Sequence, residues 1–178
     1  SRIGGAAYEI GQNCKGIQVA NPVASGKAST STGVTISGWF RPTKLDASSY
    51  NIVIASNENN WNQGGFLAIW EQSYYFSVAM GNTHQGQNVG RTTRIVSANV
   101  WEHIAFSYAG TRLNIYEDGN AVHSNAAAQT FTDPGLVNWF VGSYGTKTVD
   151  SFIGQMDEIR FYNGEASPDW IKAEYDAA

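Results

Sequence analysis

The segment Val34-Thr35-Ile36-Ser37-Gly38-Trp39-Phe40 decides the fold class of this chain. Apolar, mainly β-branched residues alternate in it with small polar ones, and a period of two is typical of a strand with one buried face. Pro42 follows and is expected to end the strand, because proline lacks the backbone donor that a sheet needs. The segment therefore predicts a β-strand that lies on a hydrophobic core.

Short apolar runs of the same kind recur along the chain, separated by polar turns. We expect further strands at residues 52–54, 66–70, 74–80, 103–108, 113–116, 121–123, 139–141 and 152–162. Asp118-Gly119 is a strong signal for a tight hairpin turn. Strands at this regular spacing favour a sandwich or jelly roll over alternating strand and helix units.

One helix is expected, and it lies at the end of the sequence. Ser167 is a good N-cap, and Pro168 suits the first helical position. Trp170, Ile171 and Tyr175 then form an apolar stripe that is short enough to dock on the sandwich. We predict an all-β fold of two antiparallel sheets in a jelly-roll sandwich, with one short C-terminal helix, in a single domain over residues 1–178.

The composition argues against two classes of partner. The chain has 15 acidic and 11 basic residues, so its net charge is −4, and no basic patch of the kind found in nucleic-acid binders is concentrated in it. No stretch approaches the roughly 20 apolar residues of a membrane span. We therefore expect neither nucleic-acid binding nor membrane insertion.

Five segments, taken in order, resemble the laminin-G-like, concanavalin-A-like family of bacterial exported proteins. They are residues 35–42, 101–106, 113–119 with its Tyr-x-Asp-Gly ending, 153–163 and 167–175. The resemblance implies a jelly roll of two curved sheets, a secreted or cell-surface location, and attachment to a larger multidomain protein. It leaves function open, because such relatives include carbohydrate-binding modules, adhesins, protein-binding modules and glycoside hydrolases.

The acidic residues do not form the motif of hydrolases on this fold. Laminarinase-like enzymes carry Glu-x-Asp-x-x-Glu on one strand, and this chain has no such motif. Glu117-Asp118 and Asp157-Glu158 are adjacent pairs, and adjacent residues of a strand point to opposite faces. We expect a non-catalytic domain. A glycoside hydrolase or polysaccharide lyase with an atypical active site is the enzymatic alternative.

Aromatic and amide residues supply the candidate carbohydrate contacts. An exposed indole stacks on the apolar face of a sugar ring while neighbouring amides bind hydroxyl groups. The predicted contacts are Trp61 with its neighbours Asn60 and Asn62, followed by Trp70, Trp139, Tyr144 and Arg91. Arg91 would favour an acidic glycan, and the alternative for Trp70 and Trp139 is core packing.

The remaining tryptophans, Trp39, Trp101 and Trp170, fall within family-like segments and are expected to pack against the fold. We thus predict a lectin-like, carbohydrate-binding module whose partner is a polysaccharide or glycan. A protein-interaction or adhesion domain without a sugar site is the alternative.

The resemblance also implies a structural Ca²⁺ site. In many concanavalin-A-like hydrolases and modules, the Asp of the final strand helps to hold calcium on the convex side, and Asp157 stands at that place. Ca²⁺ takes six to eight oxygen ligands, so the N-terminal segment would supply others, with Glu9 as its acid. The alternative is that Asp157 caps backbone amides or pairs with an arginine.

Overall fold

The computed structural model describes 103 of the 178 residues of the chain. The described residues are 8–10, 16–19, 34–45, 51–55, 64–70, 73–79, 89–91, 95–109, 112–126, 139–143, 151–162 and 164–178. The description covers the backbone alone for residues 8–10, 34, 51–55, 73–79, 89–91, 109, 125–126 and 139, and for 64–70 apart from Ile69.

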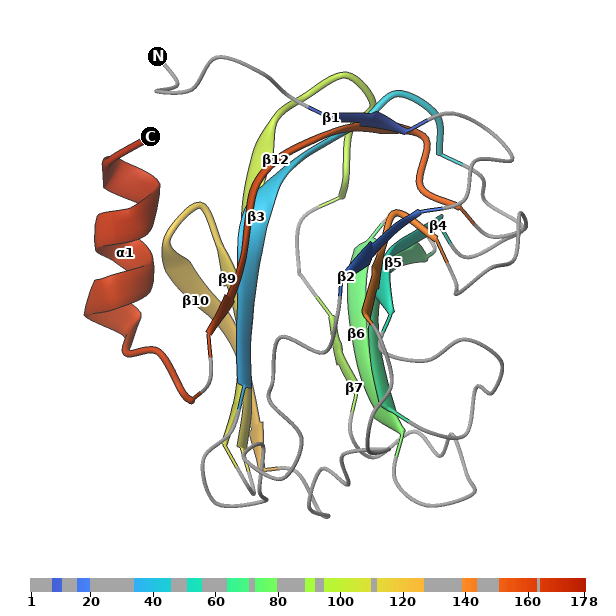
Figure 1. Ribbon diagram of the computed structural model, residues 1–178. Helices are drawn as coiled ribbons and strands as arrows, with labels where there is room; N and C mark the ends of the chain where they lie inside the picture. Colours follow the sequence, from blue (N-terminus) through green and yellow to red (C-terminus); the bar gives the residue numbers. More distant parts are fainter. Residues whose placement is uncertain are drawn as a thin grey trace.

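Two six-stranded sheets form the body of the fold (Figure 1). Sheet A contains, in spatial order, β1 (Tyr8–Ile10), β12 (Gly154–Tyr162), β3 (Val34–Pro42), β8 (Glu102–Ala109), β9 (Arg112–Glu117) and β10 (Asn120–Ala126). Sheet B contains β2 (Ile17–Val19), β11 (Trp139–Val141), β4 (Asn51–Ala55), β5 (Gly64–Trp70), β6 (Ser73–Ala79) and β7 (Val89–Arg91).

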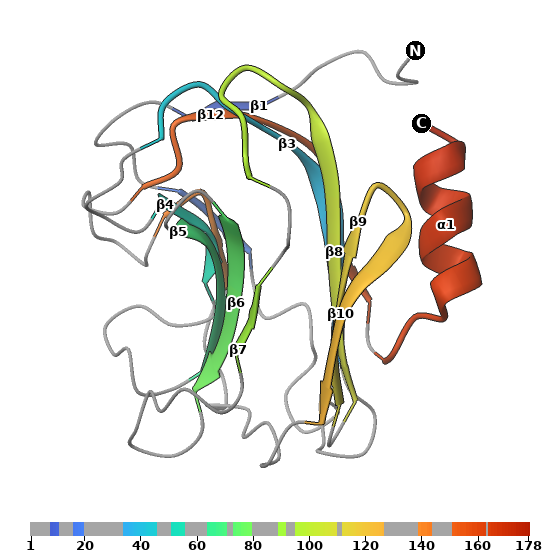
Figure 2. The same cartoon turned by 180° about the vertical axis from the view of Figure 1, so that it is seen from behind.

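Neighbouring strands are antiparallel throughout both sheets. The helix α1 (Pro168–Asp176) lies on the outer face of sheet A, as Figures 1 and 2 both show. The predicted all-β sandwich with a C-terminal helix is confirmed. Within the described residues, no helix combines the length and apolarity that crossing a bilayer requires.

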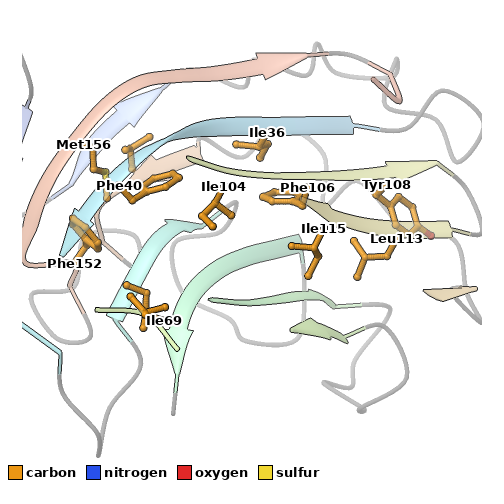
Figure 3. Packing of buried hydrophobic residues seen from close by; sticks show 12 residues of the cluster. Ile36, Phe40, Ile69, Ile104, Phe106, Tyr108, Leu113, Ile115, Phe152 and Met156 are labelled. Carbon is orange, nitrogen blue, oxygen red and sulfur yellow. The ribbon is translucent and has the colours of Figure 1, made fainter. Parts of the chain in front are cut away.

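The core lies between the two sheets and is built from alternate residues of sheet A (Figure 3). On β3 the buried inward residues are Ile36 and Phe40, and β8 and β9 follow the same alternation. The full set of buried residues in this cluster is Ile36, Phe40, Ile69, Val96, Ile104, Phe106, Tyr108, Leu113, Ile115, Val141, Phe152 and Met156. Each such side chain contributes about 1.5–3 kcal/mol when it is fully buried.

A β-bulge interrupts the pairing of β12 with β3 between Asp157 and Arg160. Glu158, inside the bulge, has a φ of 51°, in the left-handed region. Before the bulge Met156 is buried in the core, whereas after it Ile159 and Phe161 pack against the core. The extra residue therefore shifts the alternation, so that Arg160 faces α1 on the outer side.

Three short strands were not expected from the sequence. They are β1, β2 and β7, and β7 lies at the end of a segment that reads as a loop. Each has three residues and forms the edge of its sheet. Three residues are too few for an alternating pattern, so pairing with a neighbour, and not propensity, makes these segments strands.

The β9–β10 turn needs its glycine for two reasons. Asp118 and Gly119 have φ values of 48° and 77°, as in the type I′ turn that Asp-Gly predicts. A Cβ on Gly119 would also lie 2.8 Å from Cδ of Lys172 and 3.1 Å from Cβ of Tyr175, both on α1. The turn can therefore approach the helix only because residue 119 has no side chain.

We predict that Gly119→Ala lowers the free energy of unfolding by about 1–2 kcal/mol, the range for a non-glycine residue in the left-handed region. Ser124→Ala, an exposed change on β10, serves as the control and should stay within about 0.5 kcal/mol of wild type. Urea unfolding followed by circular dichroism measures both. Equal stability of Gly119→Ala and wild type would contradict this account of the turn.

Candidate functional site

Sheet B holds the backbone of three of the predicted carbohydrate contacts. Trp70 ends β5 and pairs with Ser73 across the β5–β6 turn. Trp139 begins β11, opposite Val19, and Arg91 ends β7, opposite Tyr75. The other predicted contacts, Asn60, Trp61, Asn62 and Tyr144, lie outside the described residues.

The strand register separates these positions into two groups. Phe140 pairs with Ala55, and Ala55 pairs with Phe66, so Trp139 lies at the end of sheet B where β4 ends and β5 begins. Trp61 lies in the chain between those two strands. We call this the β4–β5 end of sheet B.

Trp70 lies at the opposite end of β5, beside the β5–β6 turn, and we call this the β5–β6 end. Arg91 is closer to this end, because its partner Tyr75 pairs in turn with Ala68. At about 3.3 Å per residue, the step from Phe66 to Trp70 spans about 13 Å. The three predicted contacts whose backbone is described therefore do not meet at one point.

The two sheets differ in what covers their outer faces. The helix α1 lies over sheet A, whereas no described helix or strand lies over the outer face of sheet B (Figure 2). On the edge strand β2, Ile17 and Gln18 are exposed. Among the described elements, sheet A has a helix on its outer face and sheet B has none.

A polar cluster that sequence reasoning missed lies between sheet A and α1. Its centre is Glu174 of the helix, whose Oε1 accepts hydrogen bonds from Ser37 Oγ at 2.7 Å and Arg160 Nη1 at 2.5 Å. His103 is fully buried, with Nε2 3.9 Å from the same oxygen, which is too long for a hydrogen bond. The sequence feature that could have indicated this cluster is the presence of polar residues, Ser37 and His103, at outward positions of β3 and β8.

Ser37, His103 and Glu174 have the residue types of a hydrolytic triad but not its geometry. In a triad the imidazole lies between the hydroxyl and the acid, so that it can take the hydroxyl proton. Here Ser37 donates directly to Glu174, and all three side chains are buried beneath α1. The cluster therefore holds the helix to the sheet and does not activate a nucleophile.

The ionisation of the cluster follows from its contacts. Burial raises the pKa of Glu174, but His103, the Ser37 hydroxyl and the Arg160 guanidinium lower it by more, so the pKa lies below its ordinary value. Burial alone would lower the pKa of Arg160, yet Glu174 and Glu158 raise it above its ordinary value. Both groups are therefore charged at neutral pH.

The loop before α1 also attaches through polar groups of sheet A. Thr35 Oγ1 donates to the Gly164 carbonyl at 2.8 Å and accepts from the Ala166 amide at 2.9 Å. Asn114 Nδ2 donates to Glu165 Oε1 at 3.0 Å. Thr35 and Asn114 on this face thus have partners in the C-terminal segment.

Trp170 departs from its expected packing role. It remains 41% exposed on α1 and stacks on Tyr162 of β12, with ring centroids 5.8 Å apart and planes at 28°. Tyr162 is 48% exposed. The helix uses Ile171 for burial instead, since that side chain is fully enclosed.

Three carboxylates of the two adjacent pairs, those of Asp118, Asp157 and Glu158, bind the backbone or an arginine. Asp118 Oδ1 accepts from the His103 amide at 3.1 Å, and Asp157 Oδ1 accepts from the Glu158 amide at 2.9 Å. Glu158 Oε2 accepts from Arg160 Nη2 at 3.0 Å. Asp157 therefore caps the amide inside the β12 bulge, which is the alternative to a metal-ligand role.

The predicted calcium ligands lie on neighbouring strands. Glu9 of β1 pairs with Gln155 of β12, two residues from Asp157. In the part of the chain that the structure describes, no group of three His, Cys, Asp or Glu residues could hold a metal ion. Backbone carbonyls and water can complete a Ca²⁺ shell, so the site stays a prediction.

Comparison of the sequence with known protein families shows which family the chain belongs to. The family profile described as the concanavalin A-like lectin/glucanases superfamily, of the laminin-G type, matches residues 15–172. The chain therefore belongs to that superfamily, as the five sequence segments predict. No curated protein sequence matches the chain.

Similar solved structures share the sandwich at low sequence identity. The CBM40 domain of the Ruminococcus gnavus IT-sialidase, bound to α2,3 sialyllactose, has a TM-score of 0.70 at 17% identity, with 95% of this chain and 96% of that chain covered. Domain 4 of AbnA, a GH43 extracellular arabinanase from Geobacillus stearothermophilus in complex with arabinotriose, has a TM-score of 0.66 at 16% identity, covering 94% and 75%.

The receptor-binding domain of botulinum neurotoxin type G has a TM-score of 0.63 at 14% identity. The alignment covers 82% of this chain but only 38% of that one. These likenesses show the fold, a jelly-roll sandwich, and leave the ligand to be argued from the chain itself.

We predict that Ca²⁺ raises the melting temperature of the metal-stripped protein. An ion that binds only the folded state adds about 2.7 kcal/mol at about 100 times its Kd. Thermal unfolding with excess chelator and then with millimolar Ca²⁺ measures the effect. A melting temperature that does not respond to Ca²⁺ would rule out a stabilising site.

Two variants separate the metal role of Asp157 from its capping role. Asp157→Asn keeps an oxygen that can accept from the Glu158 amide but loses the charge, whereas Asp157→Ala loses both. We expect Asp157→Ala to lose the calcium response and also stability without metal, whereas Asp157→Asn should keep the cap and bind Ca²⁺ more weakly. A full calcium response in Asp157→Ala would assign the site to other ligands.

Proposed function

We propose that this domain is a non-catalytic carbohydrate-binding module of a larger secreted or cell-surface protein, and that its ligand is a glycan bound on sheet B. One observation carries the proposal. The helix α1 covers the outer face of sheet A, while sheet B, which no described element covers, holds the backbone of Trp70, Arg91 and Trp139.

Solved structures with a similar fold support the choice of a glycan as the ligand. Two of the similar structures hold saccharides, sialyllactose in the CBM40 domain and arabinotriose in domain 4 of the arabinanase. Both belong to larger enzymes and are binding parts of them. A binding module attached to a catalytic or surface protein is the corresponding role for this chain.

We place the primary contact at the β4–β5 end of sheet B. Trp61 supplies an indole, Asn60 and Asn62 supply amides, and Trp139 begins β11 at the same end. Stacking on an aromatic ring and hydrogen bonds from amides are the two interactions that a sugar ring can make at once. Trp70 and Arg91 at the β5–β6 end would extend the site for a longer or acidic chain.

The described carboxylates support a non-catalytic role. Asp118 and Asp157 cap backbone amides, and Glu158 and Glu174 pair with Arg160. A glycosidase needs two carboxyl groups that face each other across a cleft, about 5–10 Å apart. These four carboxylates are instead engaged in holding a turn, a bulge and a helix.

A protein-contact role is the second candidate, and one observation favours it. Tyr162 and Trp170 form an exposed aromatic pair on the helix side of the molecule. Exposed aromatic side chains are enriched where proteins bind each other. The pair is small for an interface, so we rank this function below glycan binding.

We predict that Trp61→Ala weakens glycan binding severalfold or more while the fold stays intact. Loss of one aromatic stacking contact removes about 0.5–1.5 kcal/mol beyond the area lost. A glycan array identifies the ligand, and calorimetry measures its affinity. Trp170→Ala is the matched control: it removes an exposed indole on the helix side and should bind as wild type does.

A second pair of variants tests where on sheet B the glycan lies. Trp139→Ala should weaken binding of a short oligosaccharide, whereas Trp70→Ala should affect only longer ligands that reach the β5–β6 end. Affinities for an oligosaccharide series in the two variants give the answer. Reduced binding of the shortest ligand in Trp70→Ala alone would move the primary contact to the β5–β6 end.

We also predict no catalytic turnover. Incubation with β-glucans, galactans and uronic-acid polymers should release no new reducing ends, because Asp118, Asp157, Glu158 and Glu174 have structural partners and the hydrolase motif is absent from the sequence. Sustained release that survives repurification would replace the binding-module proposal with an enzymatic one.

A further inference from the structure

The helix α1 attaches to sheet A through one fully buried residue and through ring contacts of Tyr175 with Trp39 and His103 and of Trp170 with Tyr162. Ile171 is its one fully buried residue, and it packs with Ala105, Tyr116 and Ala166. The helix has nine residues, and isolated helices of that length are marginal in water. Its folded state therefore depends on how well it docks.

The Glu174 carboxylate joins the helix to three strands at once. It accepts from Ser37 of β3 and Arg160 of β12, and His103 of β8 lies 3.9 Å away. Its side chain is only 5% exposed, so water screens these contacts little. Removing the charge would weaken the acceptor of the buried Ser37 hydroxyl and would remove one of the two carboxylates that pair with the partly exposed Arg160 guanidinium.

Several buried polar atoms around Glu174 have no hydrogen-bond partner. They are Trp39 Nε1, both ring nitrogens of His103, and Glu174 Oε2. Burying such atoms without partners is unfavourable. All four would gain water if α1 left the sheet, and this lowers the free energy that undocking requires.

We propose that Glu174 is an acid-sensitive latch, whose protonation releases α1 from sheet A while the β-sandwich stays folded. Release would uncover an outer sheet face that carries Trp39, His103, Asn114 and Tyr116, all on strands that the core continues to hold. This undocking of α1 is independent of whether sheet B binds a glycan.

The direction of the pH effect follows from the lowered pKa of Glu174 in the docked state. A free glutamate binds its proton at higher pH, so the docked state binds fewer protons than the undocked state. Docking is therefore favoured above the ordinary glutamate pKa and is lost as the pH falls through the docked pKa.

The other charged groups near the latch come from each element that packs against it. Arg160 and Glu158 belong to β12, Asp118 to the β9–β10 turn, and Lys172, Tyr175 and Asp176 to α1 itself. His103 of β8 also faces Glu174, with Nε2 3.9 Å from Oε1.

Hydrogen exchange followed by mass spectrometry tests the latch in the full chain. At neutral pH, Glu174→Gln should exchange the α1 amides faster by roughly tenfold or more, as expected from losing charge-assisted hydrogen bonds. The amides of β8 and β9 should be unaffected. Asp176→Asn, which removes an exposed acid from the same helix, should exchange as wild type does.

The wild-type protein supplies an independent test without any substitution. As the pH is lowered, and after correction for intrinsic exchange rates, the α1 amides should lose protection before those of β8 and β9. Loss of protection in helix and strands together, or equal α1 exchange in Glu174→Gln and wild type, would overturn the proposal. If Glu174→Gln does not fold, Ser37→Ala replaces it, since it removes one donor and keeps the charge.

Discussion

The bulge at Asp157–Arg160 sets which side chains of sheet A face the core and which face the helix. Without the extra residue, Arg160 would share the inward face with Met156, and a guanidinium would lie in an apolar core. With it, Ile159 and Phe161 pack inward and Arg160 meets Glu174. Asp157 stabilises the turn of the backbone by accepting from the Glu158 amide. The docking of α1, and therefore the covering of sheet A, depends on this one change of register.

The covering of sheet A divides the molecule into a structural side and an open side. Polar groups on the outer face of sheet A are engaged with α1 and the loop before it, and the carboxylates there have backbone or arginine partners. Sheet B has no such cover among the described elements, and it holds the predicted contacts whose backbone is described. The same contacts that hold the helix on sheet A thus leave sheet B as the face on which we propose that a glycan binds.

Much of the fold could be predicted from local pattern, because alternation in residues 34–40, 103–108 and 113–116 records one buried face directly. The bulge is also visible in the sequence, because the apolar residues Met156, Ile159 and Phe161 are three and then two positions apart, whereas a regular strand would keep a spacing of two. The short strands β1, β2 and β7 show no alternating pattern in the sequence, because each has only three residues.

The candidate contacts could be chosen by residue type, but their division between two ends of sheet B depends on strand register. Register arises from pairing between distant segments, which no local pattern contains. The polar cluster around Glu174 was missed for the same reason.

The central claim is that a glycan binds on sheet B and that the helix-covered face of sheet A takes no part in binding. Amide chemical-shift mapping by NMR, with the tightest ligand found on a glycan array, tests it most directly. The account predicts that the shifts concentrate in residues 51–79 and 139–141, while residues 103–117 and α1 remain unperturbed. Shifts concentrated in α1, β8 and β9, with sheet B unchanged, would contradict it.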